Sequence, residues 1–174
     1  MPRIFIALPI SNELKQTIKQ WRKSYADLPV RWLDDKNLHI TLVPPWEERD
    51  LPKVLAALRK HPTQFGPQTL AFTETGFGPD EHEPRLIWAK GEAPYELSQL
   101  REKIERLLER PLTKKGFLQH LTLARFKPDD FASFPYKTLD KSIHWNEVAS
   151  EFVVMESKLL PEGAEYTVLE KFPL

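Results

Sequence analysis

Residues 39–42, His-Ile-Thr-Leu, return as residues 120–123, His-Leu-Thr-Leu, 81 positions later in a chain of 174 residues. Apolar and polar residues alternate through both copies, which predicts that each is a β-strand. Residues two positions apart on a strand project from the same face, so each copy places an imidazole beside a threonine hydroxyl. The repeated pair is therefore the pattern on which both the fold and the chemistry depend.

The sequence around the two copies also repeats. A short β-branched and aromatic run at residues 3–8 has a counterpart that begins 82 positions later, at Arg85. Each run is followed by a predicted helix, the first with Ser11 as N-cap and the second opened by Pro94. The segments Leu70-Ala-Phe and Phe152-Val-Val are also 82 positions apart. These offsets indicate an internal duplication.

Further elements complete the pattern. We expect a helix from Asp50 to Pro62, strands at 69–73, 148–158 and 166–172, and a turn region at 76–79. The predicted fold class is α+β. It is a bilobal, pseudo-twofold, duplicated fold with two mainly antiparallel sheets, helices outside and a central cleft. One domain is expected over residues 1–174, with lobes that correspond approximately to the repeat halves 1–80 and 81–174.

Composition narrows the function. The chain has no Cys, which excludes disulfides, thiolate catalysis and Cys-ligated metal sites. No apolar run approaches the ~18 residues of a membrane span, so we expect a soluble, cytoplasmic protein without a membrane partner. Although 25 Lys and Arg balance 25 Asp and Glu, residues 110–127 contain five basic residues and no acid. This local positive charge suits a short anionic ligand, unless it pairs with acidic segments across the fold.

Two His-x-Thr strands that face each other across a cleft would form a cradle for a tetrahedral phosphate. An imidazole titrates near ~6.5, so one of the two can accept a proton while the other donates one. Hydrolysis of a phosphodiester needs this combination, and a strained cyclic phosphate requires no metal. His39, Thr41, His120 and Thr122 are therefore the candidate catalytic residues, with no cofactor and no metal ligand expected.

The paired motifs, the opening strand Arg3-Ile-Phe-Ile-Ala-Leu and the ending Gly163-Ala-Glu-Tyr-Thr-Val-Leu resemble the two-histidine (2H) phosphoesterases. Within that superfamily the chain is most similar to the RNA 2',3'-cyclic phosphodiesterases, also called 2'-5' RNA ligases. The resemblance implies metal-independent hydrolysis of a terminal 2',3'-cyclic phosphate to a 2'-phosphomonoester, with reversible 2'-5' RNA ligation as a side activity. It also implies that His39 is the proton donor, His120 the proton acceptor, and Thr41 and Thr122 ligands of phosphate oxygens.

Two further residues are candidates for substrate binding. Arg125 follows the second motif and matches a frequent arginine of that family, so it could contact the phosphate or the next nucleotide. Phe5 is a weak candidate for stacking on a base. Tyr166 is interpreted as a packing residue. The chain departs from the family pattern at residues 43–46, Val-Pro-Pro-Trp, and at Gln119, and both departures are expected at the rim of the cleft.

Other classes of function remain open. The protein could be a non-catalytic module that binds RNA ends or nucleotides, or a 2H phosphoesterase for another small cyclic phosphate. A metal hydrolase that uses His39 and His120 as ligands has less support, because neither copy brings a carboxylate or a second His into ligand spacing. The expected partners are RNA ends or cyclic nucleotides, and a monomer is expected.

Overall fold

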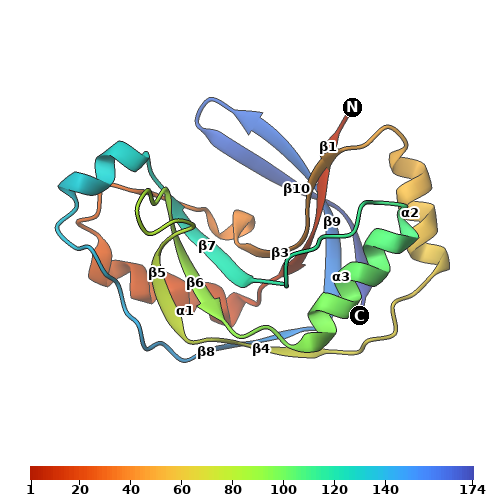
Figure 1. Cartoon of the computed structure of the whole chain (residues 1–174), viewed down its shortest axis with the longest axis horizontal. Coiled ribbons are helices and arrows are strands. Elements are labelled where there is room, and N and C mark those ends of the chain that lie inside the picture. The colour runs from red at the N-terminus through yellow and green to blue at the C-terminus, as the bar shows by residue number, and fades with distance from the viewer.

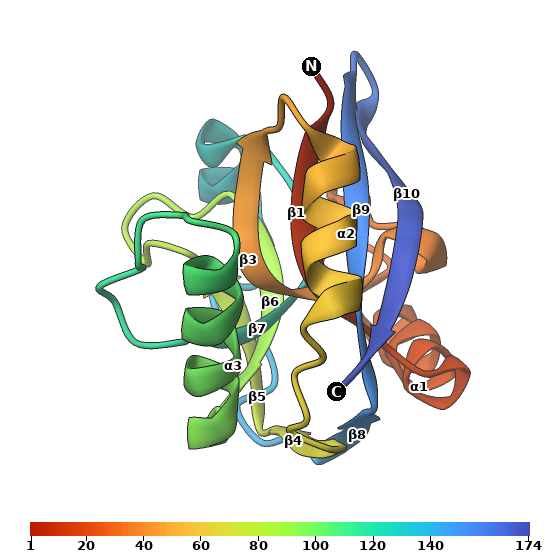
Figure 2. The ribbon, with the colours of Figure 1, turned by 90° about the vertical axis from the view of Figure 1, so that its right-hand side faces the viewer.

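The computed structural model describes all 174 residues, and its strands form two four-stranded sheets and one separate pair. All neighbouring strands are antiparallel. The first sheet has the order β10 (Gly163–Pro173), β9 (Glu151–Leu160), β1 (Arg3–Pro9) and β3 (His39–Glu47). Figure 2 shows these four strands side by side. The second sheet has the order β2 (Arg31–Trp32), β7 (Gln119–Arg125), β6 (Leu86–Gly91) and β5 (Glu74–Gly78). The separate pair consists of β4 (Gln68–Phe72) and β8 (Trp145–Ala149).

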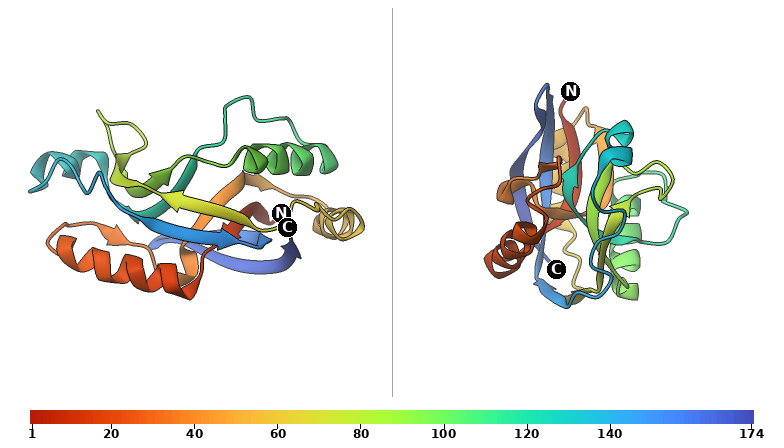
Figure 3. Two further views of the ribbon diagram at one scale, coloured as in Figure 1. Left: turned by 90° about the horizontal axis from the view of Figure 1, so that it is seen from below. Right: turned by 90° about the vertical axis from the view of Figure 1, so that its left-hand side faces the viewer.

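Three α-helices lie outside the strands, as Figures 1 and 3 show. They are α1 (Asn12–Arg22), α2 (Leu51–Lys60) and α3 (Tyr95–Leu107). The Ser11 hydroxyl accepts the Leu14 N–H at 3.2 Å, and the Asp50 carboxylate accepts the Lys53 N–H at 3.0 Å. Both side chains satisfy N–H groups that a helix N-terminus leaves free. Helices outside two antiparallel sheets confirm the predicted α+β class. Short 3-10 helices occupy Lys23–Tyr25 (η1), Asp35–Asn37 (η2) and Pro128–Ser133 (η3).

The two sheets do not correspond to the two halves of the chain. Strands β9 and β10, from the second half, complete the sheet that contains β1 and β3. Strands β2 and β5, from the first half, complete the sheet that contains β6 and β7. The prediction that residues 1–80 and 81–174 form separate lobes is therefore wrong. Each half completes its sheet with strands from the other half, which joins the two sheets into one unit.

The sheet orders also correct one alignment of the repeat. In the first sheet β9 lies next to β1, which in turn pairs with β3, and in the second sheet β5 lies next to β6, which in turn pairs with β7. The counterpart of β9 is therefore β5, and the strands β4 and β8 pair with each other. The predicted alignment of Leu70-Ala-Phe with Phe152-Val-Val made β4 the counterpart of β9. This alignment is wrong, because the two strands occupy different places in the fold. The matches of β1 with β6 and of β3 with β7 agree with the topology.

Three strand boundaries differ from the sequence prediction. Residues 74–78 form β5, although Gly76, Gly78 and Pro79 favoured a turn. The single strand expected at 148–158 is divided at Ser150 into β8 and β9. The last strand begins at Gly163 rather than Tyr166 because it forms a long hairpin with β9. This hairpin extends beyond the rest of its sheet in Figure 1.

The main apolar core covers only one face of the first sheet. Ile4, Ile6 and Leu8 of β1 point into the main apolar core, whereas Phe5 and Ala7 point to the opposite face. On that opposite face they form a small cluster with Val153 and Met155, against which Tyr166 packs. Since Ala7 pairs with Thr41 across the sheet, the first His-x-Thr motif shares this face. The cluster therefore forms the floor of the region that holds the motif.

Candidate active site

The two His-x-Thr motifs lie on β3, at one edge of the first sheet, and on β7, an inner strand of the second sheet, and both form strands as their alternating patterns predict. In β3, Ile40 and Leu42 are buried, while His39 and Thr41 are partly exposed on the opposite face. In β7, Leu121 and Leu123 are buried in the same way, while His120 and Thr122 are partly exposed. The buried residues anchor each strand in the core, so the histidine and threonine of each motif project together from it.

An aromatic ring from the first strand of each half supports each histidine. The Phe5 ring on β1 lies 4.9 Å from the His39 ring, between centroids. The Trp88 ring on β6 lies 5.4 Å from the His120 ring. Tyr166 on β10 adds an edge-on contact with His39 at 5.1 Å. These contacts restrict the orientation of both imidazoles.

Backbone carbonyls determine which nitrogen of each imidazole carries the proton. The carbonyl of Asn37 lies 2.8 Å from Nδ1 of His39, and the carbonyl of Leu118 lies 3.1 Å from Nδ1 of His120. A carbonyl oxygen only accepts, so Nδ1–H donates in both cases. Nε2 of each neutral ring is then left as an acceptor. His39 Nε2 lies 3.2 Å from the Thr41 hydroxyl, which can donate to it.

Burial lowers the pKa of both imidazoles. The pKa of His39 falls to about 4, first because the ring is desolvated and further because His120 and Arg125 lie nearby. The pKa of His120 is also lowered, by desolvation and by the charge of Arg125. The free site therefore holds two neutral imidazoles at neutral pH. A bound anion would offset the charge of Arg125 and favour protonation of one ring.

One cavity brings the two motifs together. His39, Thr41, His120 and Thr122 all line a pocket of about 140 Å³ between β3 and β7. Its other lining residues are Phe5, Leu33, Asn37, Pro45, Arg125 and Tyr166. The volume suits a single small polar group such as a phosphate rather than a whole nucleotide. We call it the two-histidine pocket.

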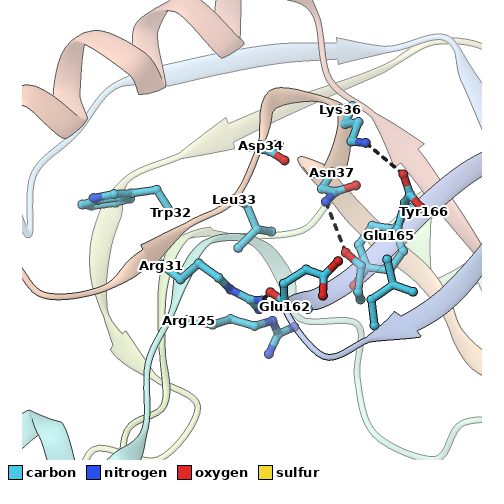
Figure 4. Close-up of a pocket in the computed structure, with 13 residues that line it drawn as sticks. Arg31, Trp32, Leu33, Asp34, Lys36, Asn37, Arg125, Glu162, Glu165 and Tyr166 are labelled. Carbon is cyan, nitrogen blue, oxygen red and sulfur yellow. Dashed lines mark hydrogen bonds and ion pairs between the residues drawn. The ribbon is translucent and has the colours of Figure 1, made fainter.

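A second and larger pocket adjoins the two-histidine pocket. It has a volume of about 370 Å³ and is drawn in Figure 4. The two pockets share four lining residues, which are Leu33, Asn37, Arg125 and Tyr166. Arg125 is exposed at the end of β7 and reaches both pockets. A ligand with a phosphate in the first pocket can therefore extend into the second.

Comparison with known proteins places this architecture in a family. The family model described as the 2'-5' RNA ligase superfamily matches residues 10–158. The chain belongs to the 2'-5' RNA ligase superfamily. It is 34% identical over 186 residues to a Thermus thermophilus protein named RNA 2',3'-cyclic phosphodiesterase, with 99% of this chain and 90% of the relative aligned.

Two further comparisons cover the whole chain. An Archaeoglobus fulgidus protein, also named RNA 2',3'-cyclic phosphodiesterase, is 28% identical over 179 residues, with 98% of this chain and 99% of the relative aligned. The crystal structure of TT0787 of Thermus thermophilus superposes with a TM-score of 0.79 at 28% identity, over 99% of this chain and 97% of the other. The resemblance inferred from the motifs is thus confirmed at the level of the superfamily and its cyclic phosphodiesterase branch.

Within this superfamily member, two sequence interpretations need correction. Phe5 is only 1% exposed and packs against the rings of both His39 and Tyr166, so almost none of its surface is available to stack on a base. Gln119 is fully buried and donates from its side-chain amide to the Ala71 carbonyl at 2.8 Å, so it is not at the cleft rim. At residues 43–46, the other place where the sequence departs from the family pattern, Pro45 lines the two-histidine pocket.

Sequence reasoning also missed residues that the structure places at the site. Tyr166 lines both pockets, although the sequence interpretation gave it only a packing role. Asn37 holds His39 through its backbone carbonyl, and its side chain donates to the Ala164 carbonyl at 3.3 Å. Its position two residues before His39, matched by Leu118 before His120, is the signal that could have identified it.

Two properties of the whole structure complete the description. No group of three or more His, Asp and Glu side chains is arranged to hold a metal ion. None of the helices is both long and apolar enough to span a membrane.

Proposed function

We propose that this protein hydrolyses terminal 2',3'-cyclic phosphates of RNA or nucleotides to 2'-phosphomonoesters, with His39 and His120 as the acid and base. The observation that carries the proposal is the two-histidine pocket, where two imidazoles whose Nε2 atoms can accept a proton and two threonines line one small cavity. The names of the two full-length relatives support the same substrate.

The reaction needs two proton transfers on opposite sides of the phosphorus. A water molecule attacks phosphorus and forms a new P–O bond, while the P–O3' bond breaks in line with it. Nε2 of His120 takes a proton from the water, and Nε2 of His39 gives a proton to the departing O3'. Each such positioned transfer is worth typically about 10²- to 10⁴-fold in rate. The products are a 2'-phosphomonoester and a free 3'-hydroxyl.

His39 must gain a proton before it can act as the donor. Its pKa of about 4 in the free site means that it is neutral when the substrate arrives. The cyclic phosphate is an anion, and its charge beside the imidazole stabilises the protonated ring. Binding and protonation are thus coupled, and the donor is charged when the phosphate is in place.

The remaining polar residues hold the phosphate. The hydroxyls of Thr41 and Thr122 and the guanidinium of Arg125 line the same pocket and donate hydrogen bonds to phosphate oxygens. They have no proton to exchange near neutral pH, so their role is to position the phosphorus and stabilise the charge that develops on its oxygens.

The same geometry accounts for 2'-5' joining as a side activity. If the 5'-hydroxyl of another RNA replaces water, His120 takes its proton and the P–O3' bond breaks as before. The product is then a 2'-5' phosphodiester, and the reverse reaction uses the same two groups with their roles exchanged. One chain supplies both histidines, so the proposed reaction requires only a monomer. We assign the protein to the cytoplasm.

The test is an assay of the purified protein against adenosine 2',3'-cyclic phosphate and adenosine 3',5'-cyclic phosphate, with and without EDTA. We expect adenosine 2'-phosphate from the first substrate, at the same rate in EDTA, and no turnover of the second. Binding without turnover would favour the non-catalytic module. Turnover of only the second substrate would favour another small cyclic phosphate, and loss of activity in EDTA would favour a metal hydrolase.

A further inference from the structure

Two arginines face each other in the larger pocket. Arg31 on β2 is the direct cross-strand partner of Arg125 on β7. Side chains at opposed positions of an antiparallel pair project to the same face, and like charges placed in this way repel each other. Both residues line the pocket of about 370 Å³, and Figure 4 shows their side chains next to each other on one side of it. An anion bound between them would remove the repulsion.

No carboxylate of the protein neutralises this pair. Neither arginine takes part in any of the eight ion pairs of the structure. Three acids line the pocket: Glu165 is paired with Lys36 at 3.2 Å, and Glu162, drawn near the two arginines in Figure 4, forms no ion pair with either of them. Figure 4 shows Asp34 on the opposite side of the pocket from the two arginines. The charge of the arginine pair is therefore available to a ligand.

The β9–β10 hairpin holds Arg31 in place. The Arg31 guanidinium donates to the backbone carbonyl of Glu162 at the tip of the hairpin. The next residue, Gly163, has φ of +134°, and a Cβ there would overlap the Arg31 guanidinium. Because Gly163 has no side chain, the Arg31 guanidinium can pack directly against the hairpin tip. This contact fixes the charged end of Arg31 at the edge of the pocket.

The larger pocket adjoins the two-histidine pocket beside His39, through Asn37 and Tyr166, which both contact that histidine, and beside β7, through Arg125. Asn37, whose carbonyl accepts from His39, lines both pockets. In the proposed reaction His39 protonates O3' while O2' stays bonded to phosphorus, so the ribose of the terminal nucleoside lies on the His39 side of the phosphate. The next anionic group along an RNA chain is the phosphodiester attached to the 5'-oxygen of the same nucleoside.

We propose that Arg31 and Arg125 bind this phosphodiester, the one that joins the terminal nucleotide to the rest of an RNA. The larger pocket is then a second phosphate subsite, and it makes an RNA end a better substrate than a mononucleotide. Arg125 serves both phosphates because it lines both pockets, whereas Arg31 lines only the larger one. The inference rests on the proposed function for the direction of the substrate.

The test compares a cyclic mononucleotide with a dinucleotide that ends in a 2',3'-cyclic phosphate. We expect Arg31→Gln to lower kcat/KM about 10- to 100-fold for the dinucleotide and to leave the mononucleotide within about twofold, since a charge-assisted hydrogen bond is lost only in the first case. Arg31→Lys, which keeps the charge, should retain part of the preference. Arg49→Gln is the matched control, because Arg49 is exposed and lies outside both pockets.

A neutral linkage shows whether the internal phosphate is the partner of Arg31. In a dinucleotide with a methylphosphonate between its two nucleosides, Arg31→Gln should have no effect, which completes a double-mutant cycle. For the natural dinucleotide, Arg31→Gln should also reduce the slope of log kcat/KM against log salt by about 0.7, as expected for one lost phosphate contact on a single strand. An equal loss with both linkages, or with both substrate lengths, would overturn the inference.

Binding of products separates this inference from the proposed function. Calorimetric titration with the dinucleotide and mononucleotide 2'-monophosphates needs no turnover, and Arg31→Gln should weaken only the dinucleotide. If the wild-type protein cleaves neither substrate but binding shows this difference, the proposed reaction fails and the second phosphate site stands. If both substrates are cleaved and Arg31→Gln does not discriminate, the second phosphate site fails alone.

Discussion

The His39 imidazole is largely buried, unlike that of an ordinary surface histidine. Its pKa is lowered to about 4, mainly by burial. We expect NMR titration of the imidazole in the free protein to show no protonation above pH 5, and added inorganic phosphate to raise the His39 pKa because the anion replaces lost solvation. A free-protein pKa near 6.5, or one that phosphate does not move, would contradict the proposed coupling of binding to protonation.

The same shift has a consequence for stability, and its sign follows from linkage. The unfolded chain binds the His39 proton near pH 6.5, whereas the folded chain does not until about pH 4. As pH falls through this window, the unfolded state is favoured, by up to about 3 kcal/mol. Urea unfolding at pH 7.5 and pH 5 should therefore show a larger loss of stability for the wild type than for His39→Asn.

The threonines test whether the cavity is a phosphate site. Thr41→Val and Thr122→Val each remove a hydroxyl that lines the two-histidine pocket while keeping the β-branched shape of the strand residue. Each should lower kcat/KM for a cyclic phosphate by about 1.5–3 kcal/mol, roughly 10- to 150-fold. The pH profile, which the histidines determine, should keep its shape. Unchanged kinetics in the double threonine variant would reduce both residues to strand formers.

At the scale of single elements, the β9–β10 hairpin depends on Gly163. A side chain at this position would be strained in two ways, by the positive φ of +134° and by overlap with Arg31. Gly66 is a matched control, because it has φ of +74° and nothing within 4 Å of an added Cβ. Gly66→Ala should cost about 1 kcal/mol, and Gly163→Ala more than that. Equal losses in thermal unfolding would show that the hairpin tip does not rest on Arg31.

Element prediction from the sequence succeeded where periodicity and capping agreed. The strands β3 and β7 follow from alternation around His39 and His120, and the start of α1 follows from Ser11. It failed where tertiary pairing overrode local preference. Residues 74–78 are held extended by pairing with β6, although Gly76 and Gly78 disfavour a strand. These glycines accommodate the Trp88 ring, which would collide with a side chain at Gly78.

The residues of the site that could be predicted from the sequence are mainly those in the repeated motif. His39, Thr41, His120 and Thr122 are identified by the duplication, and Arg125 by its position after the second motif. Tyr166 and Arg31 carry no such signal, and Asn37 carries only its place two residues before His39. The structure brings them to the site through the hairpin, η2 and the short strand β2, and these contacts join residues more than 90 positions apart. The same exchange between distant segments made the halves of the chain an incorrect guide to the sheets.

At the scale of the whole molecule, strand exchange predicts that neither half folds alone. Residues 1–80 lack β9, the neighbour of β1, and with it β10, and residues 81–174 lack β5, the neighbour of β6. Each fragment would expose the edge of a buried central strand. We expect fragments 1–80 and 81–174 to be unfolded separately by circular dichroism and to recover activity when mixed. Cooperative unfolding of one isolated fragment would contradict the exchanged architecture.

In the proposed reaction two imidazoles act on one phosphate, and a double-mutant cycle in turnover tests this most directly. His39→Ala, His120→Ala and the double variant should be compared with the wild type on adenosine 2',3'-cyclic phosphate. Each single variant should lose about 10²-fold or more, and the double variant should lose much less than the product of the two, because both groups serve one transition state. Near-normal turnover in either single variant, or a double loss equal to that product, would contradict the paired acid and base.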